Sequence, residues 1–283
     1  MWQEIDEKEQ AMTTTATANR IRIGSVEFYC ETRGCGSGLL LVPGAGGDSG
    51  QYDSLAAALA TTHRVVTYDR RSCSRSTRPA QWATTSVEEQ ADDAAGLIAA
   101  LGVGPMDVFG NSTGALIALC LAQRAPSAVS RLVVHEPALM SVLEDPDLAM
   151  AIVQPVIAEG MEHGGMEGGA EAFLRFAGGP AYDRIPTDAI ARILNNAEVL
   201  FVAEFGAFAS WAPDPAALST SPVAISVLSS GRTAPFFVEA AQWVARHVGA
   251  TVATAPGGHM GFLEDPQTFA DLVRRSLDSE LAS

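Results

Sequence analysis

The sequence predicts an α/β fold: a mostly parallel β-sheet flanked by helices, with an inserted helical cap. Short apolar runs, which suit strands buried on both faces, alternate with stretches that suit helices. This alternation stops near residue 140 and resumes near residue 221. A chain of 283 residues with 47% hydrophobic content can also bury a large core. We expect a core of residues 20–139 and 221–283, a cap of residues 140–220, and a disordered lead of residues 1–19.

The chain is predicted to open with an antiparallel hairpin. Polar and apolar residues alternate over 21–23 and 26–29, and Gly24-Ser25 between them suits a two-residue turn. The later strands are expected at 39–42, 64–68, 106–109, 131–135, 223–228 and 251–253. Because helices alternate with these strands, the strands should run parallel, with their carboxyl ends along one edge of the sheet.

The predicted core helices lie between those strands. One covers 86–101 and begins at a capping box, in which Ser86 is followed three residues later by Glu89. The others are expected at 51–60, after Ser112, at 237–247 and at 266–277. The cap is helical in composition, and we expect its glycine pairs at 164–165, 168–169 and 178–179 to break its helices.

Composition and charge limit the kinds of molecule that the protein is expected to bind. A net charge of -15 repels phosphate backbones and anionic lipid, so we expect a small-molecule substrate and neither nucleic acid nor a membrane. The four cysteines lack the spacing of a zinc or redox motif, which predicts free thiols in a cytoplasmic protein without metal or cofactor. The acidic start lacks the apolar run of a secretory signal, and Met12 offers an alternative start. A homo-oligomer is compatible with this composition.

One motif suggests a nucleophile. Gly110-Asn111-Ser112-Thr113-Gly114 has the pattern G-x-S-x-G and lies between a predicted strand and a predicted helix. Small residues on both sides let the chain turn sharply and leave the Ser112 hydroxyl exposed. That hydroxyl needs a base, which an imidazole provides near neutral pH. Of the five histidines, only His259 lies in a glycine-rich loop after the last predicted strand, where it can fold back over the serine.

Four segments together resemble the α/β-hydrolase fold family, over nearly the whole chain from Ile21 onward. They are Pro43-Gly44-Ala45-Gly46-Gly47, Asp69-Arg70-Arg71, Gly110 to Gly114, and Pro256-Gly257-Gly258-His259-Met260-Gly261. The resemblance implies a serine hydrolase with an oxyanion hole, formed by the backbone N–H of Thr113 and that of Ala45 or Gly44. Pro43 departs from the family's usual His-Gly opening of this loop, which leaves the second donor open.

The third member of the predicted triad is a carboxylate. Most relatives look to carry an Asp after the strand that follows the cap, but residues 229–235 contain no carboxylate. Glu136 follows an earlier strand at the same edge of the sheet, and zearalenone-type lactonases look similar in this respect. We therefore expect the triad Ser112, Glu136 and His259, in which Glu136 orients the imidazole. The alternatives are a surface role for Glu136 and a cap carboxylate such as Asp214.

Two further groups of side chains have competing interpretations. The cap aromatics Phe201, Phe205, Phe208 and Trp211 follow helical spacing, which suits packing of the cap. Alternatively, Phe205, Phe208 and Trp211 line an apolar substrate pocket together with Met260. The arginines 70, 71, 75 and 78 are expected on a solvated loop rather than at an anion site.

The predicted function is hydrolysis of a carboxylic ester or lactone of a small, mainly apolar substrate through an acyl-enzyme. A carbon–carbon bond hydrolase with a similar triad is one alternative. A nicotinamide oxidoreductase is another, because Gly44, Gly46 and Gly50 followed by Asp69 imitate a dinucleotide fingerprint. That fingerprint has a loose spacing and does not explain the serine motif or His259. A binding protein on a degenerate hydrolase fold would also leave this set of side chains unexplained.

Overall fold

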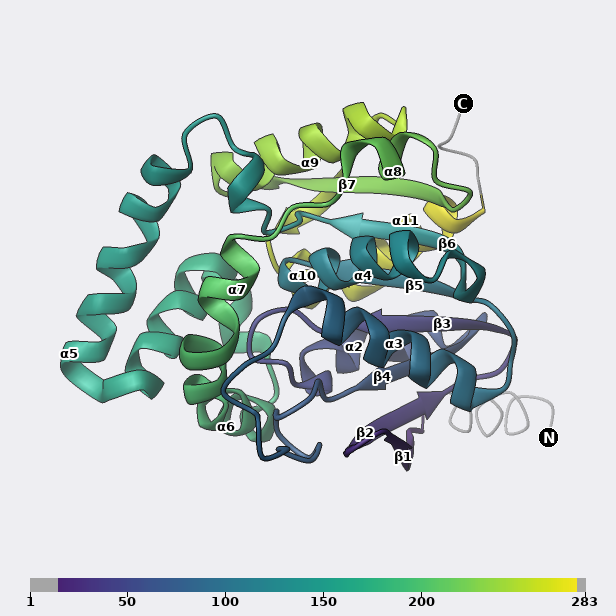
Figure 1. Cartoon of the computed structure of the whole chain (residues 1–283), viewed down its shortest axis with the longest axis horizontal. Helices are drawn as coiled ribbons and strands as arrows, with labels where there is room; N and C mark the ends of the chain where they lie inside the picture. The colour runs from purple at the N-terminus through teal and green to yellow at the C-terminus, as the bar shows by residue number, and fades with distance from the viewer. Residues whose placement is uncertain (1–14, 279–283) are drawn as a thin grey trace, which may run out of the picture.

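The computed structural model describes residues 15–278 and has an eight-stranded sheet at its centre (Figure 1). The strands are β1 (Thr17–Ile23), β2 (Val26–Arg33), β3 (Ser37–Val42), β4 (His63–Tyr68), β5 (Met106–Asn111), β6 (Val129–His135), β7 (Ala224–Arg232) and β8 (Val252–Gly258). Their order in the sheet is β1-β2-β4-β3-β5-β6-β7-β8. Only the β1–β2 and β2–β4 pairs are antiparallel. The predicted α/β fold is confirmed.

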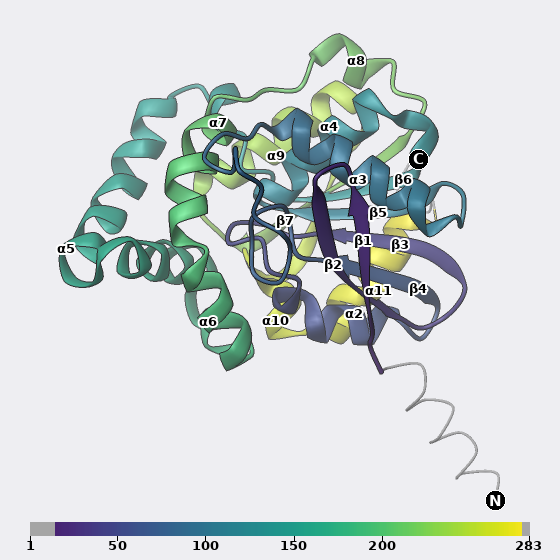
Figure 2. The ribbon, with the colours of Figure 1, turned by 60° about the horizontal axis from the view of Figure 1, so that its bottom comes forward.

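Helices cover both faces of the sheet (Figure 2). On one face lie α3 (Val87–Leu101), α4 (Thr113–Arg124) and α9 (Pro235–Val248); on the other lie α2 (Asp53–Leu59), α10 (Gly261–Glu264) and α11 (Pro266–Leu277). Each face of the sheet has its own hydrophobic core. Alternate residues of one strand pack into the two cores, because successive side chains of a strand point to opposite faces. Leu40 packs with the first set of helices, whereas Leu39 and Leu41 pack with the second.

The inserted cap follows β6 and lies beyond the carboxyl ends of the parallel strands (Figure 1). Its helices are α5 (Pro146–Gly178), α6 (Thr187–Asn195), the π-helix η5 (Val199–Glu204) and α7 (Phe205–Ala209). The short helix α8 (Pro215–Ser219) follows them but packs against α9 of the core (Figure 1). Short 3-10 turns complete the chain: η1 (Ser49–Tyr52), η2 (Pro126–Ala128), η3 (Met140–Val142) and η4 (Gly179–Arg184). Within the described residues, no helix has both the length and the apolar character required to cross a membrane.

The glycine pairs of the cap differ in what they do. Gly164 and Gly165 have non-helical backbone angles and fold α5 into two limbs, as expected. The prediction of a break at residues 168–169 is wrong, because both glycines lie inside the second limb. Gly168 instead lets the limbs approach, since a Cβ atom there would lie 2.4 Å from the Gly160 carbonyl oxygen. The pair at 178–179 ends α5.

Several strands extend beyond the residues predicted for them; β2, for example, continues to Arg33 and does not end at residue 29. β1 begins at Thr17, inside the predicted disordered lead, because Thr17 pairs with Thr32 across the hairpin; residues 1–14 lie outside the described residues. β7 and β8 continue to Arg232 and Gly258, past the ends expected from their apolar runs. Backbone pairing between Ser230 and Ala255 continues the two strands through polar and glycine-rich sequence.

Candidate active site

Ser112 lies on a sharp turn between β5 and α4. Its backbone has φ 57° and ψ −125°, a conformation that costs a non-glycine residue about 1–3 kcal/mol. The flanking glycines make the turn possible, because neither position has room for a side chain. A Cβ atom at Gly110 would lie 2.5 Å from the carbonyl oxygen of Gly114, and a Cβ atom at Gly114 would lie 2.2 Å from that of Val42. Among the described residues, nothing hydrogen-bonds to the Ser112 hydroxyl. The strained turn therefore presents an uncommitted hydroxyl at the edge of the sheet.

Glu136 and His259 form a buried pair at the same edge. Glu136 follows β6 with φ 45° and is fully buried, and His259 follows β8. The Nδ1 atom of His259 lies 2.6 Å from Oε2 of Glu136. A carboxylate accepts hydrogen bonds, so it holds the proton on Nδ1 and leaves Nε2 free to act as a base. The His259 ring also stacks on Phe237, with ring centroids 3.9 Å apart.

The segment of residues 229–235, which contains no carboxylate, supplies two hydrogen-bond donors to Glu136. The backbone N–H of Ser230 donates to Oε1 of Glu136 at 2.6 Å, and the Thr233 hydroxyl donates to Oε2 at 2.8 Å. Sequence reasoning missed both residues. The available signal was a serine and a threonine in the segment 229–235, whose short side chains bring hydroxyl and backbone donors close to an acid on the neighbouring strand.

The neighbours of Glu136 keep it ionised. Burial raises the pKa of Glu136, but the hydrogen bond from His259, the charge of the His135 and His259 rings and the hydrogen bond from Ser230 outweigh burial and lower this pKa to about 2. The neighbouring His135 behaves differently, because burial lowers its pKa to about 4 despite the nearby carboxylate. At neutral pH the site therefore holds an ionised Glu136 beside an uncharged His135.

His135 is a packed neighbour that helps to fix Ser230. The Asn111 amide donates to Nδ1 of His135 at 2.9 Å, so the ring proton resides on Nε2. Nε2–H donates to the Ser230 hydroxyl at 2.9 Å, which donates to the Gly258 carbonyl oxygen at 2.9 Å. This chain of hydrogen bonds joins β5, β6, β7 and β8 behind the Glu136–His259 pair.

A mostly apolar pocket opens beside Ser112, beneath the cap. Apart from Ser112, its polar lining residues are Thr113 and Glu204. Ala45, Phe173, Phe205, Phe208, Phe236 and Phe237 are among its apolar walls. The predicted oxyanion residues Ala45 and Thr113 thus share a pocket with Ser112, whereas Gly44 lies behind it, close to the Ser112 Cβ atom.

The four predicted pocket residues divide into two groups. Phe205 and Phe208 line the pocket. Trp211 does not, because it lies beyond the end of α7 and its indole N–H donates to Glu88 of α3 at 2.8 Å. Met260 does not either; it packs into a hydrophobic core cluster, against Gly178 at the end of α5. The expectation that Trp211 and Met260 contact substrate is therefore not supported by their positions.

The arginines after β4 are not on a solvated loop. Arg70 is 1% exposed, and Arg71 and Arg75 are half-buried in ion pairs, so the expectation is wrong for these three. Arg78 is 38% exposed in its side chain. Buried carboxylates explain the difference, because Arg70, Arg71 and Arg75 each pair with a buried acid, whereas the partner of Arg78 is the exposed Glu198.

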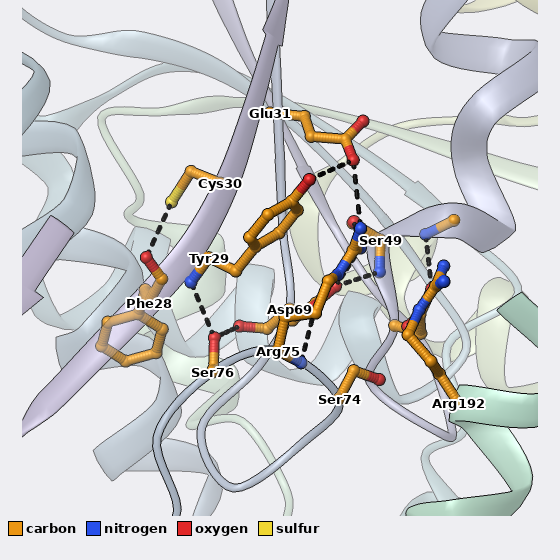
Figure 3. Close-up of polar contacts among 12 residues, drawn as sticks. Phe28, Tyr29, Cys30, Glu31, Ser49, Asp69, Ser74, Arg75, Ser76 and Arg192 are labelled. Atoms are coloured by element: carbon orange, nitrogen blue, oxygen red, sulfur yellow. Dashed lines mark hydrogen bonds and ion pairs between the residues drawn. The ribbon is translucent and has the colours of Figure 1, made fainter. Parts of the chain in front are cut away.

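Asp69 is one of those carboxylates and is fully committed (Figure 3). Its Oδ1 accepts from the Ser49 backbone N–H at 2.9 Å, and its Oδ2 accepts from Nε of Arg75 at 2.7 Å. The Arg75 guanidinium also covers the Tyr29 ring, 3.7 Å from its centroid. Asp69 therefore ties the loops after β3 and β4 together and is not available to bind ribose hydroxyls.

The turn at Ser112 opens to a capped pocket at the carboxyl edge of the sheet, and this is the architecture of the α/β-hydrolase fold. The sequence profile of the Alpha/beta hydrolase family matches residues 39–272, and the chain belongs to this family. The predicted resemblance is thereby confirmed.

Similar proteins agree with this assignment. The chain is 38% identical over 137 residues to the uncharacterized hydrolase YraK of Bacillus subtilis (strain 168), covering 48% of this chain and 51% of that protein, about half its length. It is 24% identical over 269 residues to the zearalenone hydrolase of Bionectria ochroleuca, covering 90% of this chain and 96% of that one. The structure of carboxylesterase CesB (YbfK) from Bacillus subtilis has the same fold, with a TM-score of 0.71, 20% identity, and coverage of 98% and 96%.

Proposed function

We propose that the protein cleaves a carboxylic ester or lactone of a small, mainly apolar substrate through a serine acyl-enzyme. The observation that carries this proposal is the 2.6 Å contact between Nδ1 of His259 and Glu136, at the same edge of the sheet as the strained turn of Ser112. This contact leaves Nε2 of His259 as the free basic atom, which a serine nucleophile requires.

The proposed reaction has two stages. Nε2 of His259 takes the Ser112 proton as Oγ attacks the carbonyl carbon, and the N–H groups of Ala45 and Thr113 stabilise the tetrahedral oxyanion. The oxyanion collapses, the bond to the leaving oxygen breaks, and His259 returns its proton to that oxygen. Water then attacks the acyl-enzyme with His259 as base, releasing the acid and restoring Ser112.

The two sides of the site suit different parts of a substrate. The acyl group fits the apolar pocket beside Ser112, where Phe205, Phe208 and Phe236 would cover it. A second hollow contains His259, Arg232 and Thr233 and is more polar. Because His259 protonates the leaving group, the alcohol side belongs in this second hollow. A lactone would span both.

A panel of p-nitrophenyl esters with acyl chains of graded length, beside several lactones, tests the proposal. We expect kcat/KM to rise by about fourfold for each methylene that the apolar pocket buries, and to fall once the pocket is full. A p-nitrophenyl ester with an anionic acyl group of matched length is the control and should react more slowly. Turnover confined to β-diketones would favour the carbon–carbon bond alternative.

Addition of NAD or NADP is expected to leave the melting temperature unchanged. A ligand that binds only the folded state raises its stability, by about 2.7 kcal/mol at a hundred times the Kd. The acid that a dinucleotide site would use, Asp69, is paired with Arg75 and hydrogen-bonded to Ser49. Differential scanning fluorimetry across millimolar cofactor is the measurement, and a concentration-dependent rise would return the oxidoreductase alternative to consideration.

A further inference from the structure

Arg70 and Glu204 form a buried ion pair between the core and the cap. Arg70 lies just after β4, and Glu204 is the last residue of η5. Their side chains are 1% and 3% exposed. Nη1 of Arg70 lies 2.5 Å from Oε1 of Glu204, and Nη2 lies 2.9 Å from Oε2, so the contact is bidentate. A planar guanidinium forms this geometry, whereas an ammonium cannot.

Gln90 of α3 hydrogen-bonds to both members of the ion pair. Its Oε1 accepts from Arg70 at 2.5 Å, and its Nε2 donates to Glu204 at 3.0 Å. Removing two charges from water is costly, and a buried ion pair is often no more stable than apolar side chains of similar volume. Because such a pair contributes little net stability, we look for its role in the groups that its geometry holds in place.

The same guanidinium holds the loop after β3, which we call the β3 loop (residues 43–48). Nη2 of Arg70 donates to the Gly44 carbonyl oxygen at 3.1 Å. Gly44 C=O and Ala45 N–H belong to one trans peptide plane, so they point in opposite directions. The Gly47 N–H of the same loop also donates to this carbonyl oxygen, at 3.1 Å. Because Arg70 holds the carbonyl from outside the loop, it fixes the peptide plane relative to the core and with it the direction of the Ala45 N–H. Among the described residues, that N–H has no acceptor, and Ala45 lines the pocket with Ser112.

The cap holds the β3 loop at two other points. The Asn196 amide donates to the Gly46 carbonyl oxygen at 2.7 Å, and Asn196 is buried. Nε of Arg192 lies 2.7 Å from Oδ2 of Asp48. Three polar side chains of the cap thus converge, directly or through Arg70, on a loop of six residues beside Ser112.

We propose that Arg70, held by Glu204, is a positioning residue that orients the Ala45 N–H toward the oxyanion. This inference rests on the proposed serine mechanism and deepens it, because it makes the cap part of transition-state stabilisation. Glu204 fixes the guanidinium, Arg70 fixes the Gly44 carbonyl, and the peptide plane transmits the orientation to Ala45. The effect acts on the transition state, where the carbonyl oxygen carries full charge, more than on the bound ester.

Arg70→Lys tests the proposal, with Arg71→Lys as its matched control. Lysine keeps the charge but cannot hold both Glu204 oxygens and the Gly44 carbonyl at once. Arg71 is the next residue and makes its own bidentate pair with Asp93, at 2.5 and 2.7 Å, and among the described residues it makes no hydrogen bond to the β3 loop. Because loss of one oxyanion donor costs about 10²–10³ in kcat, misorientation in Arg70→Lys should cost about 10–10². KM should change by less than about threefold, since ground-state binding is preserved.

Two further measurements separate positioning from folding. Affinity for an alkyl boronic acid, which forms a tetrahedral anion on Ser112, should fall by the same factor as kcat in Arg70→Lys and stay unchanged in Arg71→Lys. The double variant Arg70→Met/Glu204→Met removes both charges, so it should fold even if the lysine variant does not. It should show the same loss of kcat, because the Gly44 carbonyl then keeps only the Gly47 N–H of its own loop and still lacks the Arg70 guanidinium.

Each outcome decides between the proposals. If Arg70→Lys matches Arg71→Lys in kcat and boronate affinity, or if the double variant retains wild-type kcat, the positioning role is wrong while the serine mechanism stands. If the wild-type protein shows no ester or lactone turnover that depends on Ser112, the proposed function itself fails.

Discussion

Replacement of Ser112 by alanine is expected to reduce kcat by about a millionfold, the loss seen when a triad nucleophile is removed. Within the described residues the Ser112 hydroxyl makes no hydrogen bond, so its loss breaks no structural contact. Alanine keeps the Cβ atom, so the strain of the positive φ is unchanged. The melting temperature should therefore stay close to that of the wild type while turnover disappears.

Purified Ser112→Ala is assayed beside Ser130→Ala, the same substitution at an exposed position at the start of β6. Ser130→Ala should retain full activity, which rules out an effect of handling. If Ser112→Ala keeps more than about a few per cent of the wild-type kcat, well above the residual activity of other triads without their nucleophile, another group is the nucleophile.

Replacement of Glu136 by glutamine should reduce kcat by about 10⁴, as the equivalent change does in other triads. Glu136 accepts hydrogen bonds from three donors: His259, Ser230 and Thr233. A carboxylate can only accept, whereas a glutamine amide presents an NH₂ group to at least one of them. Glutamine also removes the negative charge that stabilises the imidazolium. Both effects act on His259 without changing the volume of the side chain.

The variant will also lose stability, which must be separated from the loss of kcat. Because the pKa of Glu136 is lowered from 4.5 to about 2, its ionisation stabilises the fold fully above pH 4.5 and progressively less as the pH falls toward 2. At pH 7 that stabilisation is present in the wild type and absent from Glu136→Gln. Assays should therefore run well below the melting temperature, with the folded fraction measured by circular dichroism.

Asp214→Asn is the control for the competing acid. Asp214 caps α8, where its Oδ1 accepts from the Ala216 N–H at 2.8 Å, and asparagine can make the same cap. We expect wild-type kcat from Asp214→Asn. Near wild-type kcat in Glu136→Gln would show that Glu136 is not the acid, and a large loss in Asp214→Asn would identify its replacement.

The sequence indicated the sheet and the serine turn because both depend on local patterns. Apolar runs such as Leu39–Val42 specify buried strands, and the glycines around Ser112 specify the turn. Glu136 required a different argument, the lack of a carboxylate in residues 229–235 combined with the resemblance to lactonases. Its contact with His259 agrees with that interpretation, and its catalytic role stays a prediction.

The sequence could not indicate what depends on distant partners. Arg70 was expected in solvent because an arginine is exposed unless it is paired, and its partner Glu204 lies 134 residues away. Trp211 was grouped with Phe205 and Phe208 by helical spacing, but α7 ends at Ala209, so the spacing no longer sets its direction. Met260 is next to His259 in sequence, but its side chain packs into a hydrophobic core cluster against Gly178.

The π-helix η5 has a consequence for how the length of the cap can vary among related sequences. A π-turn contains one residue more than an α-turn, so deleting a residue within Val199–Glu204 would restore α-helical winding. The residues after the deletion would rotate by about 100° relative to those before it. Glu204 would then turn away from Arg70 and leave a buried guanidinium without its carboxylate. The exposed turn at Gly164-Gly165 has no such partner, since a Cβ atom at either glycine would meet nothing within 4 Å. Insertions and deletions should therefore accumulate at the tip of α5 and be eliminated by selection at η5.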